Sequence, residues 1–316
     1  MTGVVYKSTG SRYTVKTDGG QSFECRLKGK FRIRGIKSTN PVTVGDVVDF
    51  DTEKAGDQTI GVIHHIHDRK NCIVRKSVKL SKRTHIIAAN LDQVFLIVTL
   101  KNPRTYTVFI DRFLVTAEAY DVTTVLLFNK TDIYTEEESE EVAALIRLYE
   151  KTGYTCIAVS ALTGENTEEV KALMKGKVSM FSGNSGVGKS TLINTLEPGL
   201  ELPVSAVSEQ HKQGQHTTTF AEMFDMSFGA RIIDTPGIKG FGVVDMDKEE
   251  IGDYFPEIFA LKSRCRFYNC LHLDEPGCAV KEAVAQHSIA ESRYKSYVQI
   301  LQNETGEYRT DLYGDA

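Results

Sequence analysis

The segment that most constrains the fold is a glycine-rich loop between a predicted strand and a predicted helix. Residues 183–190 read GNSGVGKS and match the pattern GxxxxGK[ST], directly after the apolar run VSMF and directly before the apolar run TLINTL. In a phosphate-binding loop of this kind, backbone N–H groups face a phosphate and the glycines permit its close approach. Lys189 then reaches the β- and γ-phosphates of a nucleotide, and the Ser190 hydroxyl binds Mg²⁺. The alternative, an ordinary glycine-rich turn, leaves the flanking strand and helix unexplained.

The chain around this loop alternates predicted strands and helices. Residues 92–100 and 124–128 are near-continuous apolar runs, which is typical of strands covered on both faces of a parallel sheet. Apolar residues recur at helical spacing over 109–117, and a second helix is expected over 136–151. The pattern predicts an α/β domain of the doubly wound type with a mostly parallel sheet. Further strands are expected at 154–159, 178–181 and 231–233.

A second motif indicates guanine as the base of the nucleotide. Residues 129–132 read NKTD and follow a predicted strand, at the edge where open α/β sheets bind ligands. The Asp132 carboxylate can accept both the N1–H and the amino group of guanine, which adenine does not present. We expect the Lys130 stem to cover the ring and Asn129 to support either the loop or the base oxygen. After the next strand, residues 160–162 (SAL) can offer a backbone N–H to the guanine oxygen.

The order of these motifs indicates a rearranged domain. Residues 234–237 read DTPG and follow the strand RII, as expected for the carboxylate that holds Mg²⁺ and the glycine that contacts the γ-phosphate. The NKTD and SAL segments, however, precede the phosphate loop, whereas in most GTPases they follow it. We infer a circular permutation, in which the old termini are joined and new ones are opened. The chain therefore leaves the GTPase domain directly after the loop that senses the γ-phosphate.

A cluster of metal-binding residues follows. It consists of Cys265, Cys270, His272 and Cys278. Three thiolates and one imidazole form the tetrahedral ligand set of a structural zinc site, with no position left for a substrate. The alternative is chance clustering. The other three cysteines are scattered along the chain, so a disulfide framework is not indicated. Helical segments are expected at 247–255 and 280–302, and we predict a small helical domain that one zinc ion per chain holds together.

The first 72 residues predict a small β-barrel with a basic stretch. Five short runs of β character occur there, and a five-stranded oligonucleotide-binding (OB) barrel is the commonest such form that binds nucleic acid. The five runs are residues 3–6, 13–17, 23–27, 46–50 and 59–66. Phe23 and Phe31 are expected in the core, with base-stacking platforms as the alternative. Alternation places five predicted RNA-binding residues on one side of an extended segment: Arg26, Lys28, Lys30, Arg32 and Arg34.

Charge is divided unevenly along the chain. The net charge is −4, yet residues 1–85 carry 17 Lys and Arg against 8 Asp and Glu, and residues 86–316 carry 21 against 34. A basic N-terminal module suggests contact with a polyanion, and a solvated basic face is the alternative. The sequence shows no apolar stretch of about 20 residues and no signal peptide. We expect a cytoplasmic protein without membrane contacts, acting as a monomer.

Together these segments resemble the ribosome small subunit-dependent GTPase A family (RsgA, also called YjeQ or YloQ) over essentially the whole chain. The resemblance rests on CRLKGKFR, FIDRFLVTAEAYDV, GNSGVGKSTLIN, GQHTTT, DTPG and CRFYNCLHLDEPGCAV, in that order. It implies a GTPase that binds the small (30S) ribosomal subunit and its ribosomal RNA. Such a protein hydrolyses GTP to GDP and phosphate in late 30S maturation, faster on the ribosome than alone. The alternative function is a GTP-gated RNA-binding scaffold in which hydrolysis is incidental.

The motifs and the resemblance together assign roles to individual residues. The four residues of the metal cluster bind zinc. Lys189, Asp234 and Gly237 act at the reacting phosphate, and Ser190, Thr218 and Asp234 hold the Mg²⁺ that accompanies GTP. The expected GTP-binding residues are Asn129, Lys130, Thr131, Asp132, Ser160, Ala161, Gly183, Asn184, Ser185, Gly186, Val187, Gly188, Lys189, Ser190 and Thr191.

The residue that activates the attacking water does not follow from the DTPG motif. Ile238 follows the DTPG motif, where many GTPases keep a glutamine that orients this water, and an isoleucine cannot do so. The nearest candidate is His216, in the predicted switch segment 214–219, because an imidazole titrates near neutral pH. The alternative for His216 is a surface histidine without a catalytic role.

These inferences divide the chain into three expected domains. An OB-type RNA-binding domain covers residues 1–72, and a circularly permuted GTPase domain covers 73–246, after a basic linker at 75–83. A zinc-binding helical domain covers 247–316 and ends in a polar tail.

Overall fold

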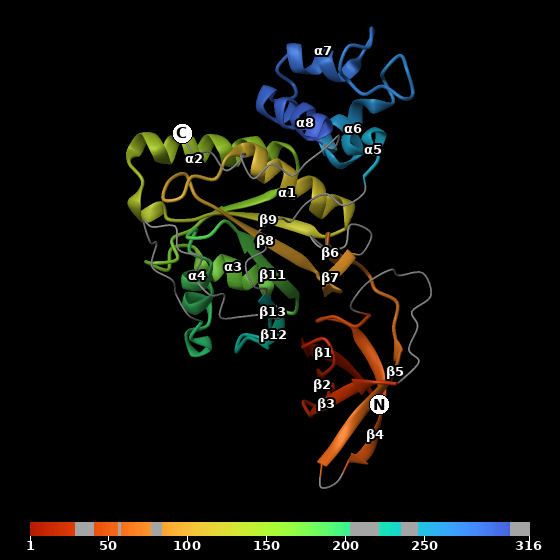
Figure 1. The fold of residues 1–316 in the computed structure, drawn as a ribbon. Coiled ribbons are helices and arrows are strands. Elements are labelled where there is room, and N and C mark those ends of the chain that lie inside the picture. Colours follow the sequence, from red (N-terminus) through yellow and green to blue (C-terminus); the bar gives the residue numbers. More distant parts are fainter. Residues whose placement is uncertain (29–40, 56–57, 77–83, 203–220, 235–245, 304–316) are drawn as a thin grey trace.

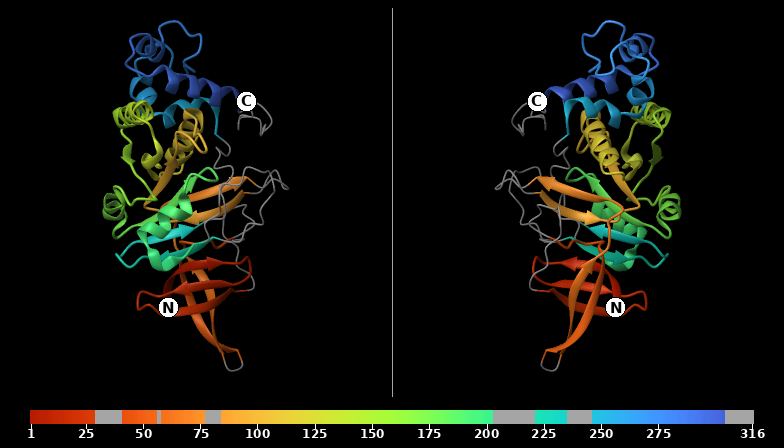
Figure 2. Two further views of the ribbon diagram at one scale, coloured as in Figure 1. Left: turned by 90° about the vertical axis from the view of Figure 1, so that its left-hand side faces the viewer. Right: turned by 90° about the vertical axis from the view of Figure 1, so that its right-hand side faces the viewer.

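The computed structural model describes the chain apart from residues 29–40, 56–57, 77–83, 203–220, 235–245 and 304–316. Three parts follow one another through an elongated molecule (Figure 1). The N-terminal barrel and the C-terminal helices lie at opposite ends of the central α/β part, as both views in Figure 2 show. The predicted fold class is confirmed.

The N-terminal part is a closed five-stranded barrel of the OB type. Its strands are β1 (Thr2–Ser8), β2 (Tyr13–Lys16), β3 (Ser22–Leu27), β4 (Val47–Ala55) and β5 (Gln58–Ile66). They pair in the order β1-β2-β3-β5-β4, and β4 closes the barrel by pairing with β1. The interior includes Tyr13, Phe50 and Ile63, each fully buried. The ring of Phe23 lies 5.3 Å from that of Phe50 and packs against this core, which confirms the core interpretation for Phe23. Phe31 lies outside the described residues.

The central sheet has the doubly wound form. Its strands run in the order β10-β9-β8-β11-β13-β12, all parallel except β12. They are β8 (Gln93–Val98), β9 (Thr123–Phe128), β10 (Thr155–Ala158), β11 (Val178–Gly183), β12 (Glu222–Asp225) and β13 (Arg231–Asp234). Two helices cover each face (Figure 1). They are α1 (Thr107–Ala119) and α2 (Glu136–Lys151) on one side, and α3 (Thr167–Met174) and α4 (Lys189–Leu196) on the other.

Strand β8 shows why the central strands are apolar throughout. Its alternate residues Val94 and Leu96 pack under α1 and α2, whereas Phe95 and Ile97 pack over α3 and α4. All four side chains are buried, because a parallel strand with helices on both faces has no solvent side.

Helix α2 begins at Glu136 because Thr135 and Glu138 form a reciprocal capping box.

The connections between strands place a switch point beside β8. The chain moves outward from β8 to β9 and β10, then crosses back to β11 on the other side of β8. Because β8, β9, β10, β11 and β13 are parallel, their carboxyl ends share one edge of the sheet. Open α/β sheets bind ligands at such an edge, next to the switch point.

Several short elements were not predicted. They are β12, α3, two single turns, η1 (Thr131–Ile133) and η2 (Pro198–Leu200), and a two-stranded ladder of β6 (Cys72–Lys76) with β7 (Thr84–Ala89). The expected linker at 75–83 is therefore wrong for its first two residues, which belong to β6; residues 77–83 lie outside the described part. Elements of three to eight residues contain too few positions for a periodic pattern to stand out.

The C-terminal part is a cluster of short helices. They are α5 (Lys248–Ile251), η3 (Gly252–Tyr254), α6 (Pro256–Lys262), α7 (Ala279–Ala285) and α8 (Glu291–Asn303). The helical segment expected over 280–302 is two helices, separated by a turn in which His287 has a φ of 56°. Their core includes Ile251, Phe255 and Tyr297, and it also takes in Val115 of α1. Helix α1 is thus buried against both the sheet and the C-terminal helices.

The barrel is attached to the edge of the central sheet. Strand β1 pairs with β12 through Lys7 and Glu222, whose side chains form an ion pair of 2.9 Å. The Tyr6 hydroxyl donates to Asp225 Oδ1 at 2.7 Å, and Lys16 pairs with the same carboxylate. The barrel strands and the central strands therefore form one continuous sheet.

Within the described ranges, no helix has the length and apolarity needed to span a bilayer.

Candidate functional site

Four predicted site segments lie at one edge of the central sheet. The NKTD residues follow β9, the SAL residues follow β10, the phosphate loop follows β11, and Asp234 ends β13. The sheet topology therefore brings together segments that are up to about 100 residues apart in the sequence.

Asn129 joins three of these segments. Its side chain is buried, its Nδ2 donates to the carbonyl of Val187 at 2.7 Å, and its Oδ1 accepts from the backbone N–H of Ala161 at 2.9 Å. Of the two roles expected for Asn129, the structure shows loop support. The Ala161 N–H therefore already has a partner, and the guanine oxygen would need another N–H group of the SAL segment.

Gly188 permits this close packing. Its φ is 95°, in the left-handed region that favours glycine, and a Cβ at this position would lie 2.5 Å from Asn129 Nδ2. Any side chain here would push the phosphate loop and the NKTD loop apart. The two loops are thus built against each other.

Lys130 spans the same two loops. It has a φ of 71°, and its Nζ donates to the carbonyl of Gly186 at 2.8 Å and to that of Asn102. Burial lowers the pKa of Lys130. The side chain thus reaches from the NKTD loop to the phosphate loop.

The Asp132 carboxylate is held in place from one side. The Ser160 hydroxyl, fully buried, donates to Asp132 Oδ1 at 2.5 Å and accepts from the Thr163 N–H at 3.1 Å. Asp132 itself is exposed. Because a carboxylate accepts up to about four hydrogen bonds, Asp132 retains capacity for two guanine donors. The orienting role of Ser160 was not predicted, although its position after β10 was the available signal.

Lys189 and Asp234 meet at the phosphate end of the site. Lys189 Nζ lies 2.9 Å from Asp234 Oδ1, which joins the start of α4 to the end of β13. The Ser190 hydroxyl, next along α4, and the Asp234 carboxylate are oxygen donors of the kind that Mg²⁺ prefers. His216, Thr218 and Gly237 lie outside the described residues.

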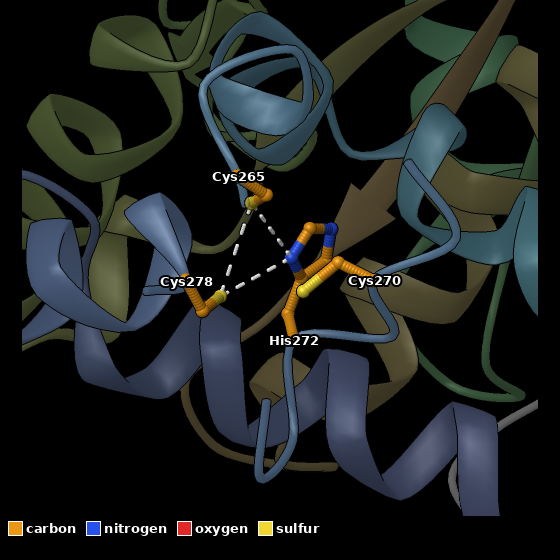
Figure 3. A group of neighbouring side chains, drawn as sticks. All are labelled: Cys265, Cys270, His272 and Cys278. Carbon is orange, nitrogen blue, oxygen red and sulfur yellow. Dashed lines mark hydrogen bonds between the residues drawn. The ribbon is translucent and has the colours of Figure 1, made fainter. Parts of the chain in front are cut away.

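The metal cluster is a closed Cys3His site (Figure 3). The ligand atoms of Cys265, Cys270, His272 and Cys278 all lie within 4.8 Å of one another. His272 Nδ1 is 3.6 Å from Cys265 Sγ and 3.4 Å from Cys278 Sγ, and these two sulfurs are 4.0 Å apart. A zinc ion with Zn–S bonds of about 2.3 Å requires neighbouring sulfurs about 3.8 Å apart. The ligand set therefore fits zinc.

The surrounding chain holds these ligands in position. Tyr294 OH donates to the carbonyl of His272 at 2.6 Å, and Tyr297 OH to that of Leu271 at 2.7 Å. Burial lowers the pKa of His272, which favours the neutral imidazole that binds metal. Burial also raises the pKa of the Cys270 thiol to about 12. A bound cation is what makes such a thiol a thiolate at neutral pH.

A buried ion-pair network joins the C-terminal helices to α1. Arg293 of α8 is 1% exposed, and its Nη1 lies 2.6 Å from Asp111 Oδ1 of α1, while its Nε lies 2.6 Å from Glu257 Oε1 of α6. Tyr149 OH also donates to Asp111 Oδ1, at 2.9 Å. These residues were not predicted from the sequence. The available signal was a charged residue, Asp111, within the apolar stripe of α1.

Only part of the predicted basic surface is described. Arg26 of β3 and Lys28, directly after that strand, are both exposed, and Arg26 pairs with Glu53 at 2.9 Å. Lys30, Arg32 and Arg34 lie outside the described residues.

Comparison with known proteins gives matches over nearly the whole chain. The family described as RsgA GTPase matches residues 66–244, and the RsgA N-terminal domain matches residues 2–63. The small ribosomal subunit biogenesis GTPase RsgA of Christiangramia forsetii is 64% identical over 313 residues, which are 99% of this chain and 99% of that protein. The crystal structure of YjeQ from Thermotoga maritima is 38% identical with a TM-score of 0.78, covering 97% of this chain and 99% of that one. YloQ, described as a circularly permuted GTPase, is 28% identical with a TM-score of 0.74 and covers 97% and 96%.

Proposed function

The chain belongs to the RsgA GTPase family, and we propose on that premise that it is a GTPase of small ribosomal subunit biogenesis. It binds the small (30S) subunit and hydrolyses GTP to GDP and phosphate late in the maturation of that subunit, which stimulates the reaction. The alternative of a scaffold with incidental hydrolysis is not favoured, because the curated relatives are named GTPases.

The observation that carries this proposal is the junction of loops at Asn129. One buried amide contacts both the phosphate loop and the SAL loop, at 2.7 Å and 2.9 Å, and it belongs to the NKTD loop itself. A site for guanine and a site for phosphates are therefore parts of one rigid unit. This arrangement suits a protein in which recognition of the base positions the phosphates for reaction.

In the proposed mechanism each part of the site has one task. Asp132, oriented by Ser160, accepts the two guanine donors. The N–H groups of the phosphate loop and Lys189 stabilise the charge on the β- and γ-phosphates. Ser190, Asp234 and Thr218 would hold Mg²⁺, which would supply further positive charge at the phosphates. We propose that His216 orients the attacking water and that Gly237 contacts the γ-phosphate.

The remaining assignments are proposals of the same kind. We propose that residues 1–72, 73–246 and 247–316 are the domains and that the protein acts in the cytoplasm as a monomer. Arg26, Lys28, Lys30, Arg32 and Arg34 are the proposed contacts to ribosomal RNA. Exposure of Arg26 in β3 and of Lys28 directly after it supports this assignment. The ion pair with Glu53 partly neutralises Arg26, so the other four residues are expected to contribute more.

Asp132→Asn is expected to weaken GTP binding by at least about 1.5 kcal/mol, which is roughly tenfold. The substitution replaces one acceptor oxygen by an amide NH2 group, which cannot accept a hydrogen bond from guanine. Calorimetric titration with GTP and ATP measures the change in specificity. Glu141→Gln is the matched control, because Glu141 is an exposed carboxylate that pairs with Arg104 away from the loops. Unchanged discrimination between GTP and ATP in Asp132→Asn would contradict the assignment.

Hydrolysis with and without purified small subunits tests the function as a whole. Multiple turnover that rises on addition of subunits is the expected result, whereas binding without stimulated turnover would support a scaffold.

His216→Ala is expected to reduce the stimulated turnover at least tenfold, equal to about 1.4 kcal/mol of barrier, while GTP and subunit binding persist. If stimulated turnover survives in this variant, another group positions the water.

A further inference from the structure

Asp49, His65 and His67 form a second group of metal-binding side chains, on the outer surface of the barrel. One ligand atom from each lies within 4.8 Å of the others. His67 Nε2 is 3.1 Å from Asp49 Oδ2, and the rings of His65 and His67 are 5.1 Å apart, edge to face. The cluster belongs to neither the nucleotide site nor the Cys3His site.

A β-bulge in β5 creates this cluster. Asp49 pairs with His65, but the next residue, Phe50, pairs with Ile63, so His64 is the extra residue of the bulge. Phe50 and Ile63 are fully buried inside the barrel. Without the bulge, strict alternation would turn His65 inward after Ile63; with it, His65 lies on the outer face beside Asp49. His67, two residues further, lies on that face as well.

The carboxylate is already held by a neighbouring strand. Thr2 Oγ1 of β1 donates to Asp49 Oδ1 at 2.7 Å, which leaves Oδ2 directed at His67. Carboxylates that bind metals are commonly oriented by such a hydrogen bond to the oxygen that faces away from the metal.

We propose that Asp49, His65 and His67 bind a divalent transition metal ion of the zinc type. Two imidazoles with one carboxylate suit Zn²⁺, Ni²⁺ or Cu²⁺, whereas Mg²⁺ and Ca²⁺ prefer oxygen ligands only. Ligand atoms about 2.1 Å from a tetrahedral ion are about 3.4 Å apart. The ligand atoms of this cluster are up to 4.8 Å apart, so the most distant pair must move closer by roughly 1.4 Å. Side-chain rotation accomplishes this because both histidines are exposed.

The site differs from the Cys3His site in two respects. It contains no thiolate, and three protein ligands leave one coordination position open to water or to an external oxygen. The ion is therefore expected to exchange readily, whereas the zinc ion in the buried cluster stays bound. Removal of the ion bound by Asp49, His65 and His67 is not expected to unfold the barrel, because the barrel core lies on the other side of the strands.

Zinc titration of the full chain tests the proposal. Protein whose Cys3His site is already filled with zinc is expected to bind one further equivalent in calorimetry. The double variant His65→Ala/His67→Ala is expected to lose that equivalent, and Asp49→Asn to weaken it at least tenfold. His64→Ala is the matched control, because His64 lies on the same strand, with Nε2 3.6 Å from Asp51, outside the cluster. Circular dichroism and GTP affinity, both expected to be unchanged, show that the variants fold.

A second measurement identifies the ligands of the added ion. Added Co²⁺ is expected to give a spectrum without a thiolate charge-transfer band, and added Zn²⁺ to protect His65 and His67, but not His64, from acylation. No further equivalent in the wild-type chain would overturn the proposal. Retention of that equivalent by the folded double variant would overturn it as well.

Discussion

Arg293→Ala is expected to detach the C-terminal helices from the central domain, at a cost of about 3 to 5 kcal/mol. Arg293 is nearly fully buried and bonds to Asp111 at 2.6 Å and to Glu257 at 2.6 Å and 3.1 Å. Its guanidinium also lies 4.7 Å from the ring centre of Phe255. Truncation leaves the fully buried Asp111 carboxylate without its counter-charge, and burial then raises the pKa of that carboxyl further.

Urea unfolding followed by circular dichroism measures this loss, and hydrogen exchange locates it in α1 and α8. Lys295→Ala is the matched control, because Lys295 is 71% exposed on the same helix and pairs with Glu291 at the surface. It is expected to change stability by at most about 0.5 kcal/mol. Combining Arg293→Met with Asp111→Leu should recover part of the stability, since an apolar pair avoids the unpaired charge of Asp111, whereas the Glu257 carboxylate, 12% exposed, still loses its partner. A loss below about 1 kcal/mol in Arg293→Ala would show that the network does not hold the helices in place.

Removal of zinc is expected to unfold the C-terminal helices as a unit. Structural zinc sites contribute about 10 to 16 kcal/mol of apparent binding free energy, which is comparable to the whole stability of an ordinary domain. Cys270 and Cys278 are part of the core of this domain, so their loss as ligands also disturbs its packing. Cys270→Ser should therefore reduce subunit-stimulated turnover while GTP affinity stays within about twofold.

Metal content, circular dichroism and GTP titration together check this prediction. Cys72→Ser is the control, because Cys72 lies in β6 outside the metal cluster and should leave all three measurements unchanged. An equal loss of GTP binding in Cys270→Ser would mean that the metal supports the nucleotide loops themselves.

The parts of the fold that could be predicted are those whose sequence pattern lies within one continuous segment of the chain. The barrel strands, the central strands and the phosphate loop each carry their signal within about ten residues, either as alternation, as a long apolar run or as glycines at fixed positions. The β-bulge at His64 carries no such signal, because it depends on how β4 and β5 align with each other. Strand β12 is also hidden, since four residues at the junction with the barrel show no periodicity.

The same distinction applies to the site. The residues that touch the nucleotide in the proposed function could be predicted from their motifs. The hydrogen bonds by which these residues hold one another in place could not. Asn129 engages loops 32 and 58 residues away, and Arg293 meets Asp111 at a separation of 182 residues. Such pairs become visible only when the sheet order and the packing of the helices are known. A charged residue in an apolar helical stripe gives a hint, but it does not identify the partner.

The pairing of β1 with β12 has a consequence for synthesis of the protein. The barrel can close once Ile66 has left the ribosome, but Glu222, which covers the outer end of β1, follows 156 residues later. At about 5 to 20 residues per second this interval lasts roughly 8 to 30 seconds. During that time the end of β1 is an unpaired strand edge, the kind of surface on which nascent chains aggregate. Lys7 lies on this edge, and a charged lysine there opposes pairing with other chains. Once Glu222 has been synthesised, it pairs with Lys7 and neutralises its charge.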